Sequence, residues 1–357
     1  MVLTPTALWV VPVSNLAGVA RHVLDVARTG IPGWRLVFLT PPGDLPRELR
    51  VAGAAVLEVP FGPDHGLRAS VASLRHALRT LRPAVVHAHL SYADIVAALA
   101  VRGPRLVTTE HGLARDDVVY HHSTAQARLM GAVHTVRLRR FDAAIAVSRA
   151  TADVMVGKWH PRVAPVVIPN GVDVVSRLAP LAAQPPIGAG LRILSLARLS
   201  PEKRLPALVD GFAELHRAHP EATLTIAGTG PEEADLRAQV ARLGLAGNVT
   251  FPGFVDPDLA MAEHDVVAML SVWENCSYSL LDAATRGLGV VASDVGGNPE
   301  ILTPRSLVRA DDASAVAKAL STQGQDLGAR PTLVDWPTVA DMCARIGATY
   351  DLLEVVR

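Results

Sequence analysis

Short apolar runs alternate with longer amphipathic stretches along almost the whole chain of 357 residues. The short runs are typical of buried strands, and the longer stretches have the spacing of helices that are apolar on one face. Strand–helix alternation of this kind predicts an α/β fold with mostly parallel sheets and helices on both faces. Apolar residues make up 50% of the chain, which suits strands that are buried on both faces.

The alternation occurs in two series. In the first, we predict strands at Ala7–Val13, Arg35–Leu39, Ala54–Val59, Ala84–His87, Arg105–Thr109, Ala143–Val147 and Val166–Ile168, and helices at Val19–Arg28, Leu67–Leu81, Tyr92–Val101 and Ala125–Arg139. In the second, we predict strands at Leu191–Ala197, Ala222–Ala227, Asn248–Phe251, Asp265–Leu270 and Gly289–Ala292, and helices at Arg204–His219, Pro231–Leu243, Tyr278–Arg286 and Trp336–Val356.

Two domains are expected, because 357 residues exceed the usual size of one core. We predict an N-terminal Rossmann-like domain at 1–175 and a C-terminal Rossmann-like domain at 191–335. The proline- and glycine-containing stretch at 176–190 is predicted to link them. Residues 336–357 are predicted to form a C-terminal helix that packs back on the first domain. Ligands of doubly wound sheets bind at the carboxyl ends of the strands, so we expect a cleft between two facing domains.

Charge and cysteine usage narrow the class of protein. The 34 basic and 34 acidic side chains cancel, which gives no support for broad nucleic-acid binding. Two distant cysteines, Cys276 and Cys343, do not form a disulfide scaffold and favour a reducing compartment. The first residues lack the basic lead of a signal peptide, and no apolar run reaches the roughly 20 residues of a membrane span. We therefore expect a cytoplasmic protein.

Peripheral contact with the inner face of a membrane stays open. The segment 128–140 carries Arg128, Arg137, Arg139 and Arg140 among apolar residues. Such a helix could rest on an anionic membrane surface near a lipid-linked acceptor. The alternative is an ordinary solvated helix face, and we favour it.

The segment 270–284 carries the most informative polar pattern. A predicted strand ends, Glu274 lies in the following turn, and Asp282 lies in the next helix. The backbone amides of Ser277–Leu280 would be the free donors of a helix N-terminus, which bind anions readily. Two acidic residues beside such amides could bind sugar hydroxyls while the amides hold a phosphate. The alternative is that Glu274 caps the helix and Asp282 is solvated.

The segment 196–204 follows the first strand of the second series. Arg198 and Lys203 flank its turn. Fixed cations there would stabilise the negative charge that builds up on a diphosphate leaving group. The alternative is a surface turn in which Ser200-Pro201-Glu202 starts a helix and both cations are in water.

Two positions of the first domain are also candidate ligand contacts. Gly18 follows the first strand and opens the first helix, where a glycine lets the backbone approach a ligand. His111 precedes Gly112 at the predicted end of a strand, a suitable place to contact a substrate. A plain strand–helix turn and a satisfied loop histidine are the alternatives.

Together these segments resemble the family-four glycosyltransferases with GT-B architecture, also known as glycosyl transferases group 1. The resemblance covers nearly the whole chain, and its pieces occur in the expected order. They are Ala17-Gly18, His87-Ala88-His89, Glu110-His111-Gly112, Ala146-Val147-Ser148, the segments 168–173, 198–203, 226–231, 251–255 and 274–282, and Gly296-Gly297-Asn298-Pro299-Glu300.

The resemblance implies a retaining transferase that moves a hexosyl-type sugar from a nucleotide diphosphate sugar to an acceptor hydroxyl. It implies that Arg198 and Lys203 hold the diphosphate and that Glu274 binds hydroxyls of the transferred sugar. It also places Asp282 at the ribose and His111 near the reacting sugar. The remaining implied donor contacts are Gly18 at the phosphates, Gly228 and Phe254 beside the base, and Ser277, Tyr278, Ser279 and Leu280 around the phosphate.

Two positions depart from the family's pattern. The ribose position usually carries glutamate, and Asp282 is one methylene shorter. The first loop commonly has two adjacent glycines, and Ala17 replaces the first of them. These departures leave a non-catalytic subunit that binds nucleotide sugar as an alternative. Another two-Rossmann enzyme, such as a nucleotide-sugar epimerase or an NAD enzyme, is a further alternative, but the first turn lacks Gly-x-Gly-x-x-Gly.

No cofactor and no metal ion are expected. His87 and His89 would share one face of a strand, and His121-His122 also invites a metal interpretation. No further ligand follows at a convincing spacing. The acceptor is not encoded in any motif, and a glycan, a glycolipid and a small metabolite all remain open.

Overall fold

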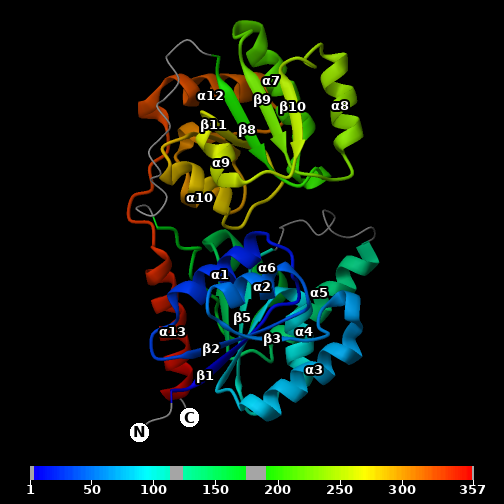
Figure 1. Ribbon diagram of the computed structural model, residues 1–357, viewed down its shortest axis with the longest axis vertical. Coiled ribbons are helices and arrows are strands. Elements are labelled where there is room, and N and C mark those ends of the chain that lie inside the picture. The colour runs from blue at the N-terminus through cyan, green and yellow to red at the C-terminus, as the bar shows by residue number, and fades with distance from the viewer. Residues whose placement is uncertain (1–3, 113–123, 174–189, 356–357) are drawn as a thin grey trace. The chain divides into compact units, whose positions relative to one another are not determined.

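The computed structural model describes residues 4–112, 124–173 and 190–355. The chain divides into two compact units, each with its own parallel sheet (Figure 1). Unit 1 comprises residues 1–171 and 337–357, and unit 2 comprises residues 172–336. The predicted linker at 176–190 lies almost wholly outside the described residues.

Unit 1 is built on a seven-stranded parallel sheet with the order β3-β2-β1-β4-β5-β6-β7. Its strands are β1 (Thr6–Val10), β2 (Arg35–Thr40), β3 (Ala55–Glu58), β4 (Val85–His89), β5 (Arg105–Glu110), β6 (Ala143–Ala146) and β7 (Val166–Val167). Its helices are α1 (Gly18–Thr29), α2 (Asp44–Val51), α3 (Gly66–Leu81), α4 (Leu90–Ala100), α5 (Thr124–Leu138), α6 (Arg149–Trp159) and α13 (Val339–Val355), with a 3-10 turn at Pro63–His65.

Alternation along β1 assigns its side chains to two cores. Ala7 and Trp9 belong to a core that α1, α2 and α13 cover, and Leu8 and Val10 belong to the opposite core under α3 and α4. Helix α13 comes from the far end of the chain, and its Tyr350 is fully buried. The indole nitrogen of Trp9 donates a hydrogen bond of 3.0 Å to the Tyr350 hydroxyl. Unit 1 is therefore completed by the last helix of the sequence.

Unit 2 is built on a six-stranded parallel sheet with the order β10-β9-β8-β11-β12-β13. Its strands are β8 (Arg192–Leu196), β9 (Thr223–Ala227), β10 (Val249–Gly253), β11 (Val266–Met269), β12 (Gly289–Ser293) and β13 (Leu307–Val308). Its helices are α7 (Leu205–Ala218), α8 (Glu233–Arg242), α9 (Pro257–Ala262), α10 (Tyr278–Thr285), α11 (Asn298–Ile301) and α12 (Ala313–Gln325), with 3-10 turns at η4 (Pro201–Lys203), η5 (Pro304–Ser306) and η6 (Leu327–Ala329).

The two faces of this second sheet are also covered. Ile193 of β8 packs with the core under α7, α8 and α12, and the next residue, Leu194, packs with the core under α9, α10 and α11. The prediction of two doubly wound parallel-sheet α/β domains is confirmed. Helices α2, α6, α9, α11 and α12 and strand β13 were not predicted. Among the described residues, no helix is both long enough and apolar enough to cross a membrane.

Candidate functional site

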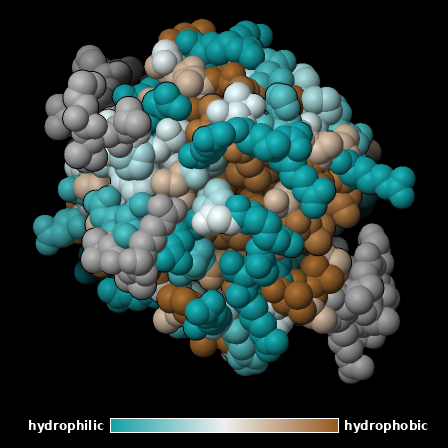
Figure 2. Space-filling view, turned by 90° about the horizontal axis from the view of Figure 1, so that it is seen from below, coloured by the Kyte–Doolittle hydropathy of each residue, from teal (hydrophilic) through white to brown (hydrophobic). Residues whose placement is uncertain are grey.

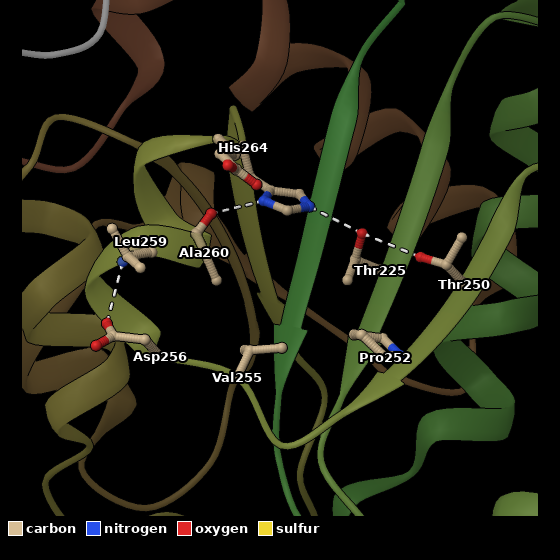
Figure 3. Close-up of a pocket in the computed structure, with 9 residues that line it drawn as sticks. Thr225, Thr250, Pro252, Val255, Asp256, Leu259, Ala260 and His264 are labelled. Atoms are coloured by element: carbon tan, nitrogen blue, oxygen red, sulfur yellow. Dashed lines mark hydrogen bonds between the residues drawn. The ribbon is translucent and has the colours of Figure 1, made fainter.

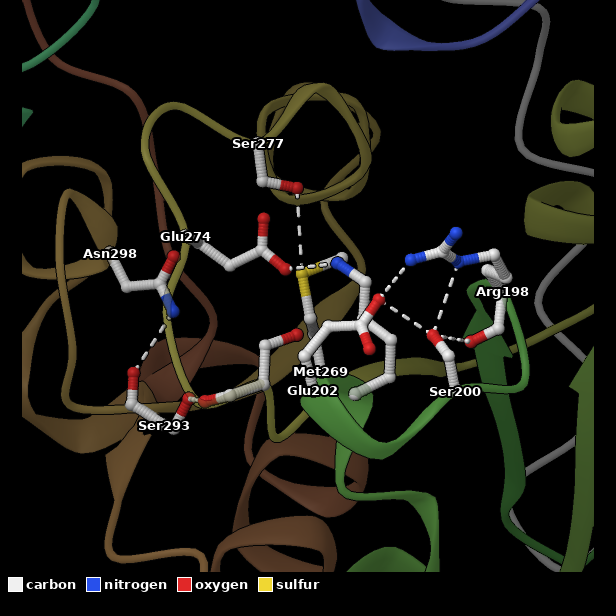
Figure 4. Close-up of polar contacts among 10 residues, drawn as sticks. Arg198, Ser200, Glu202, Met269, Glu274, Ser277, Ser293 and Asn298 are labelled. Atoms are coloured by element: carbon white, nitrogen blue, oxygen red, sulfur yellow. Dashed lines mark hydrogen bonds and ion pairs between the residues drawn. The ribbon is translucent and has the colours of Figure 1, made fainter. Parts of the chain in front are cut away.

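In unit 2, the ends of β8 and β11 bring predicted site residues together. β8 and β11 are neighbours in the parallel sheet, so the loops after their carboxyl ends lie side by side. The ammonium of Lys203 lies 2.6 Å from Oε1 of Glu274, an ion pair with side chains that are 24% and 14% exposed. The amide of Val272 donates to the carbonyl of Glu202 at 2.8 Å and joins the two loops through their backbones. The sequence-distant Lys203 and Glu274 thus form one polar cluster (Figure 4).

Arg198 belongs to the same loop but keeps much of its side chain in solvent, with 68% exposed. Its guanidinium donates to a carboxylate oxygen of Glu202 and to the hydroxyl of Ser200. The Ser200 hydroxyl also donates to Glu202 at 2.7 Å (Figure 4). Partial burial raises the pKa of Glu202, but these hydrogen bonds outweigh it, so the net pKa lies below its ordinary value. Arg198 is therefore a charged group that is held in place yet accessible to an anion.

The turn at Gly296-Gly297 holds the backbone of Glu274. The Gly297 amide donates to the Glu274 carbonyl at 2.9 Å. Gly296 has a φ of +55°, and a Cβ at this position would lie 1.9 Å from the same carbonyl oxygen. Only glycine permits this approach. The glycine pair quoted from the sequence therefore positions the Glu274 backbone.

Gly228 has a comparable structural role at the end of β9. Its φ is +140°, and an added Cβ would lie 1.9 Å from the carbonyl oxygen of Ala197. Its amide donates to Gly253 at 2.8 Å. Gly228 thus permits close packing of the loops after β8, β9 and β10. This close contact is enough to explain why glycine is required here. A contact between Gly228 and the nucleotide base of the donor stays a prediction.

Helix α10 begins after Ser277, beside this cluster (Figure 4). The side chain of its N-cap residue, Ser277, makes no capping hydrogen bond, and the first turn of a helix presents backbone amides as donors. The side chains of Tyr278 and Leu280 are buried in the core, and only their backbone amides could meet a ligand. Ser279 is partly buried.

Two alternative interpretations of this segment are wrong. Glu274 does not cap α10, because its carboxylate pairs with Lys203 instead. Asp282 is not solvated, because it is only 3% exposed.

Phe254 lies just beyond β10, and 81% of its surface is exposed. The next residue, Val255, lines a pocket of about 310 Å³ between β9, β10 and α9 (Figure 3). His264 stands in its wall, with Nε2 2.9 Å from the Thr225 hydroxyl and Nδ1 2.6 Å from the Ala260 carbonyl. Asp256 caps α9 at the opposite side of this pocket. The sequence analysis did not predict this pocket.

In unit 1, His111 follows β5 and joins a cluster of histidines. Its Nε2 lies 2.9 Å from Nδ1 of His89, at the end of β4, and the two rings stack with centroids 5.2 Å apart. His22 comes from α1, one turn after Gly18, and its ring centroid lies 4.8 Å from that of His111. One nitrogen from each of His22, His89 and His111 lies within 4.8 Å of the others.

The cluster is electrically neutral near pH 7. Burial lowers the pKa of His22 to about 4, against a smaller opposing effect of its hydrogen bond to Asn170. Burial, together with repulsion between neighbouring histidines, lowers the pKa of His87, His89 and His111 well below the ordinary range. Uncharged imidazoles can bind a hydroxyl or a metal ion through a free nitrogen lone pair.

Gly18 is the first residue of α1, and Ala17 is its N-cap with extended backbone. A Cβ on Gly18 would meet no other described atom within 4 Å. The fold of unit 1 therefore does not require glycine here, which leaves the predicted ligand approach as its remaining rationale.

A buried charge cluster supports β5 next to His111. Arg137 of α5 is 2% exposed and pairs with Asp94 and, at 3.0 Å, with Glu110. Burial raises the pKa of Glu110 to about 8, against a smaller opposing effect of the Gly112 amide. Arg137 therefore lies neither on a membrane nor on a solvated helix face, and both sequence interpretations are wrong for this residue. The side chain of Arg128 lies outside the described residues.

The structure thus joins Arg198, Lys203 and Glu274 in unit 2, with the N-terminus of α10 nearby. It places Gly18 and His111 in unit 1. Sequence reasoning missed His22, Asn170 and the Asp94–Arg137–Glu110 cluster. His22 could have been noticed because it follows Gly18 by one helical turn. Only the strand order shows which residues it contacts. His121 and His122 lie outside the described residues.

Comparison with known proteins identifies both units. Residues 16–175 match the model named Glycosyltransferase Family 4, and residues 190–326 match the model named Glycosyl transferases group 1. Glycogen synthase of Mycobacterium tuberculosis is 28% identical over 389 residues, which cover 95% of this chain and 92% of that protein. The 2-deoxystreptamine glucosyltransferase of Streptomyces kanamyceticus is 30% identical over 308 residues, which cover 78% of each.

Solved structures agree on the fold. HepE of Anabaena in complex with UDP and glucose aligns with a TM-score of 0.76 and 22% identity over 99% of both chains. Sucrose-phosphate synthase from Thermosynechococcus elongatus aligns with a TM-score of 0.78 and 20% identity over 99% of this chain and 100% of that chain. The chain has the predicted GT-B fold and belongs to family 4 of the glycosyltransferases.

Proposed function

We propose that the protein is a retaining glycosyltransferase that moves a hexosyl-type sugar from a nucleotide diphosphate sugar to an acceptor hydroxyl. The single observation that carries the proposal is the polar cluster of unit 2. There, Lys203 pairs with Glu274 at 2.6 Å, and Arg198 is held by Glu202 with most of its side chain in solvent. Several relatives are named as hexosyltransferases, a glucosyltransferase and a GDP-mannose-dependent mannosyltransferase among them, which supports a hexosyl donor.

Each group of the cluster has a proposed role. Arg198 and Lys203 bind the donor diphosphate, and backbone amides at the start of α10, at Ser277–Leu280, add neutral donors. Glu274 accepts hydrogen bonds from hydroxyls of the transferred sugar, and Asp282 accepts from the ribose. Phe254 and Gly228 border the base. In unit 1, Gly18 and His111 are proposed to contact the phosphates and the reacting sugar.

The proposed reaction is a front-face substitution. The acceptor oxygen forms a bond to the anomeric carbon while the bond from that carbon to the diphosphate oxygen breaks, and the leaving oxygen takes the acceptor's proton. A retaining glycosidase instead uses two carboxylates about 5–5.5 Å apart, one of them as nucleophile. In unit 2, the carboxylate of Glu274 pairs with Lys203, and its proposed role is to bind sugar hydroxyls and not to attack the anomeric carbon. The protein then contributes positioning and fixed positive charge.

No metal ion is required in this proposal. Two side-chain cations and the α10 amides supply the positive potential that a metal ion supplies elsewhere. The proposed acceptor is a hydroxyl on a glycan, a glycolipid or a small metabolite.

Thermal shift with nucleotide diphosphates tests the proposal first. Purified chain would be melted with UDP, GDP, ADP, TDP and CDP, each with and without EDTA. A ligand that binds the folded state raises Tm by mass action, and about 100 Kd of free ligand adds about 2.7 kcal/mol. We expect a shift with at least one diphosphate that EDTA does not change. No shift with any of them would contradict donor binding, and a shift abolished by EDTA would contradict transfer without a metal ion.

The stereochemistry needs a second experiment. Once the base is known, matched nucleotide sugars would be supplied with candidate acceptors, and the anomeric configuration of the product would be read by proton NMR. An inverted product would contradict the retaining proposal while leaving glycosyl transfer intact.

A further inference from the structure

We propose that His22, His89 and His111 of unit 1 form a binding site for Zn²⁺. The three imidazoles come from α1, from the end of β4 and from the residue after β5. One nitrogen of each lies within 4.8 Å of the other two. Any three atoms this close lie within about 2.8 Å of a common centre, against a Zn–N distance of about 2.0–2.1 Å. Binding would move each nitrogen by less than about 1 Å toward that centre and would break the hydrogen bond between Nδ1 of His89 and Nε2 of His111.

Two buried ring nitrogens without a hydrogen-bond partner support the site independently. Nε2 of His22 and Nε2 of His89 are buried, and neither has a hydrogen-bond partner among the described residues. A buried polar atom without a partner is unfavourable, and a metal ion would remove that penalty. Both side chains are at most 1% exposed, so water does not reach them freely.

Asn170 fixes the orientation of His22. Its side-chain oxygen lies 3.1 Å from Nδ1 of His22, so that nitrogen carries the proton and donates it. The proton on Nδ1 leaves Nε2 as a lone pair. Metal-binding histidines commonly donate their second ring nitrogen to a carbonyl or carboxylate in this way. His22 is therefore already oriented as a metal ligand when no ion is bound.

The chemistry of the ligands selects the class of ion. Three neutral imidazoles suit zinc and other late first-row metals, and they do not suit Mg²⁺ or Ca²⁺, which prefer oxygen ligands. His111 is only partly buried, which leaves one side of the site open for a fourth ligand.

The consequence for activity rests on the proposed function. If His111 contacts the reacting sugar, a zinc ion on the same imidazole would block that contact. Zn²⁺ should then inhibit sugar transfer, and EDTA should restore it. Binding of the nucleotide diphosphate, whose proposed contacts are in unit 2 except for Gly18, should change little.

Equilibrium dialysis of the full chain against Zn²⁺ tests the site. Chain stripped with a chelator should bind one equivalent. His111→Gln and His89→Gln should each weaken binding at least tenfold. Asn170→Ala should weaken it about 10- to 100-fold, because it removes the hydrogen bond that orients His22. His76→Gln is the matched control, since His76 is an exposed histidine of α3 in the same unit.

Cobalt substitution gives a second readout. Co²⁺ bound by three imidazoles and a solvent molecule should show the visible absorption of a four-coordinate ion, and His111→Gln should abolish it. Circular dichroism and Tm of each variant would verify folding, and the partly buried His111 makes its variant the safest.

The proposal would be overturned if the wild-type chain bound no zinc. It would also be overturned if all three variants bound zinc with the same stoichiometry and affinity as His76→Gln. A chain that binds no zinc but still shifts with a nucleotide diphosphate would keep the proposed function. A chain that is folded by its circular dichroism spectrum, yet binds neither zinc nor a nucleotide diphosphate, would overturn both proposals.

Discussion

Lys203 Nζ lies 2.6 Å from Oε1 of Glu274, although 71 positions separate the two residues in the sequence. The pair forms because η4 follows β8, Glu274 follows β11, and these two strands pair in the sheet. It places one cation and one carboxylate at the same strand ends. In the proposed function, the cation binds the charged diphosphate of the donor and the carboxylate binds hydroxyls of its neutral sugar. Both groups would then recognise one donor molecule.

Removal of the carboxylate charge should separate binding of the nucleotide from binding of the sugar. We expect Glu274→Gln to keep the thermal shift with the nucleotide diphosphate and to lower kcat with the nucleotide sugar by about 10²–10³. The amide keeps the shape of the side chain but accepts weaker hydrogen bonds from sugar hydroxyls. Loss of both the shift and turnover would show instead that Glu274 mainly positions Lys203.

The cation of Arg198 should act on the diphosphate itself. Arg198→Ala should lower both the thermal shift with the nucleotide diphosphate and kcat/KM for transfer, the latter by about 100-fold or more. Arg237→Ala is a suitable control, because Arg237 also pairs with a glutamate on its own helix but lies on α8. Transfer within a few-fold of wild type in Arg198→Ala would contradict the diphosphate assignment.

A methyl group at Gly296 should displace Glu274. The added Cβ would lie 1.9 Å from the Glu274 carbonyl oxygen, so the turn must shift. We expect Gly296→Ala to lose most transfer activity. Gly244→Ala is the matched control in unit 2, since Gly244 also has a positive φ, +72°, but its Cβ would meet no described atom within 4 Å. Both variants carry the backbone penalty of a positive φ, and only the clash differs. Equal activities would show that the turn does not position Glu274.

Acid should destabilise the chain through the buried histidines. Burial lowers the folded-state pKa of His22 to about 4, while its unfolded value is about 6.5. Between these values the unfolded state binds the extra proton, so the free energy of unfolding falls as pH decreases. From pH 7 to pH 5 this group alone should lower that free energy by about 2 kcal/mol. Below about pH 4 its contribution stops changing.

Denaturant unfolding at several pH values checks this expectation. His22→Asn should be less sensitive to pH over that window by about 2 kcal/mol, whatever its stability at pH 7. His76→Gln, the exposed control, should keep the wild-type dependence. An unchanged slope in His22→Asn would show that His22 does not titrate in the unfolding transition.

Loss of the buried Arg137 guanidinium should greatly lower the stability of the fold. Arg137→Met would leave Asp94 buried without its cation, and a broken buried ion pair typically destabilises by about 3–5 kcal/mol. Arg139→Met, two residues away on an exposed position, should change stability little. Tm by calorimetry would compare them. A wild-type Tm in Arg137→Met would mean that both acids are protonated and need no cation.

The sequence was sufficient to predict much of the fold and one of the two clusters. Apolar runs of strand length mark β8 and β11, and parallel sheets present strand ends on one edge. Arg198, Lys203 and Glu274 could therefore be expected near one another. The two-residue strand β13 and the short helices α9 and α11 were missed because so few residues carry no measurable periodicity.

The histidine cluster and the buried charges depended on information that periodicity does not contain. His22, His89 and His111 meet only because α1 follows β1, and the sheet order places β1, β4 and β5 in succession. Arg137 was misplaced because an arginine among apolar residues fits a solvated face by pattern alone. Its partners Asp94 and Glu110 are on α4 and β5, which no local window includes.

Helix α13 closes unit 1 with residues that the ribosome makes only after all of unit 2. Unit 2, residues 172–336, has left the ribosome's catalytic centre before Val339 is joined to the chain. During that interval the core around Trp9 lacks Met342, Ile346 and Tyr350, so apolar side chains of unit 1 face solvent. Nascent chains with such surfaces are prone to aggregation and attract chaperones. The order of synthesis therefore delays completion of unit 1, whose first strands precede unit 2 in the chain, until unit 2 has been made.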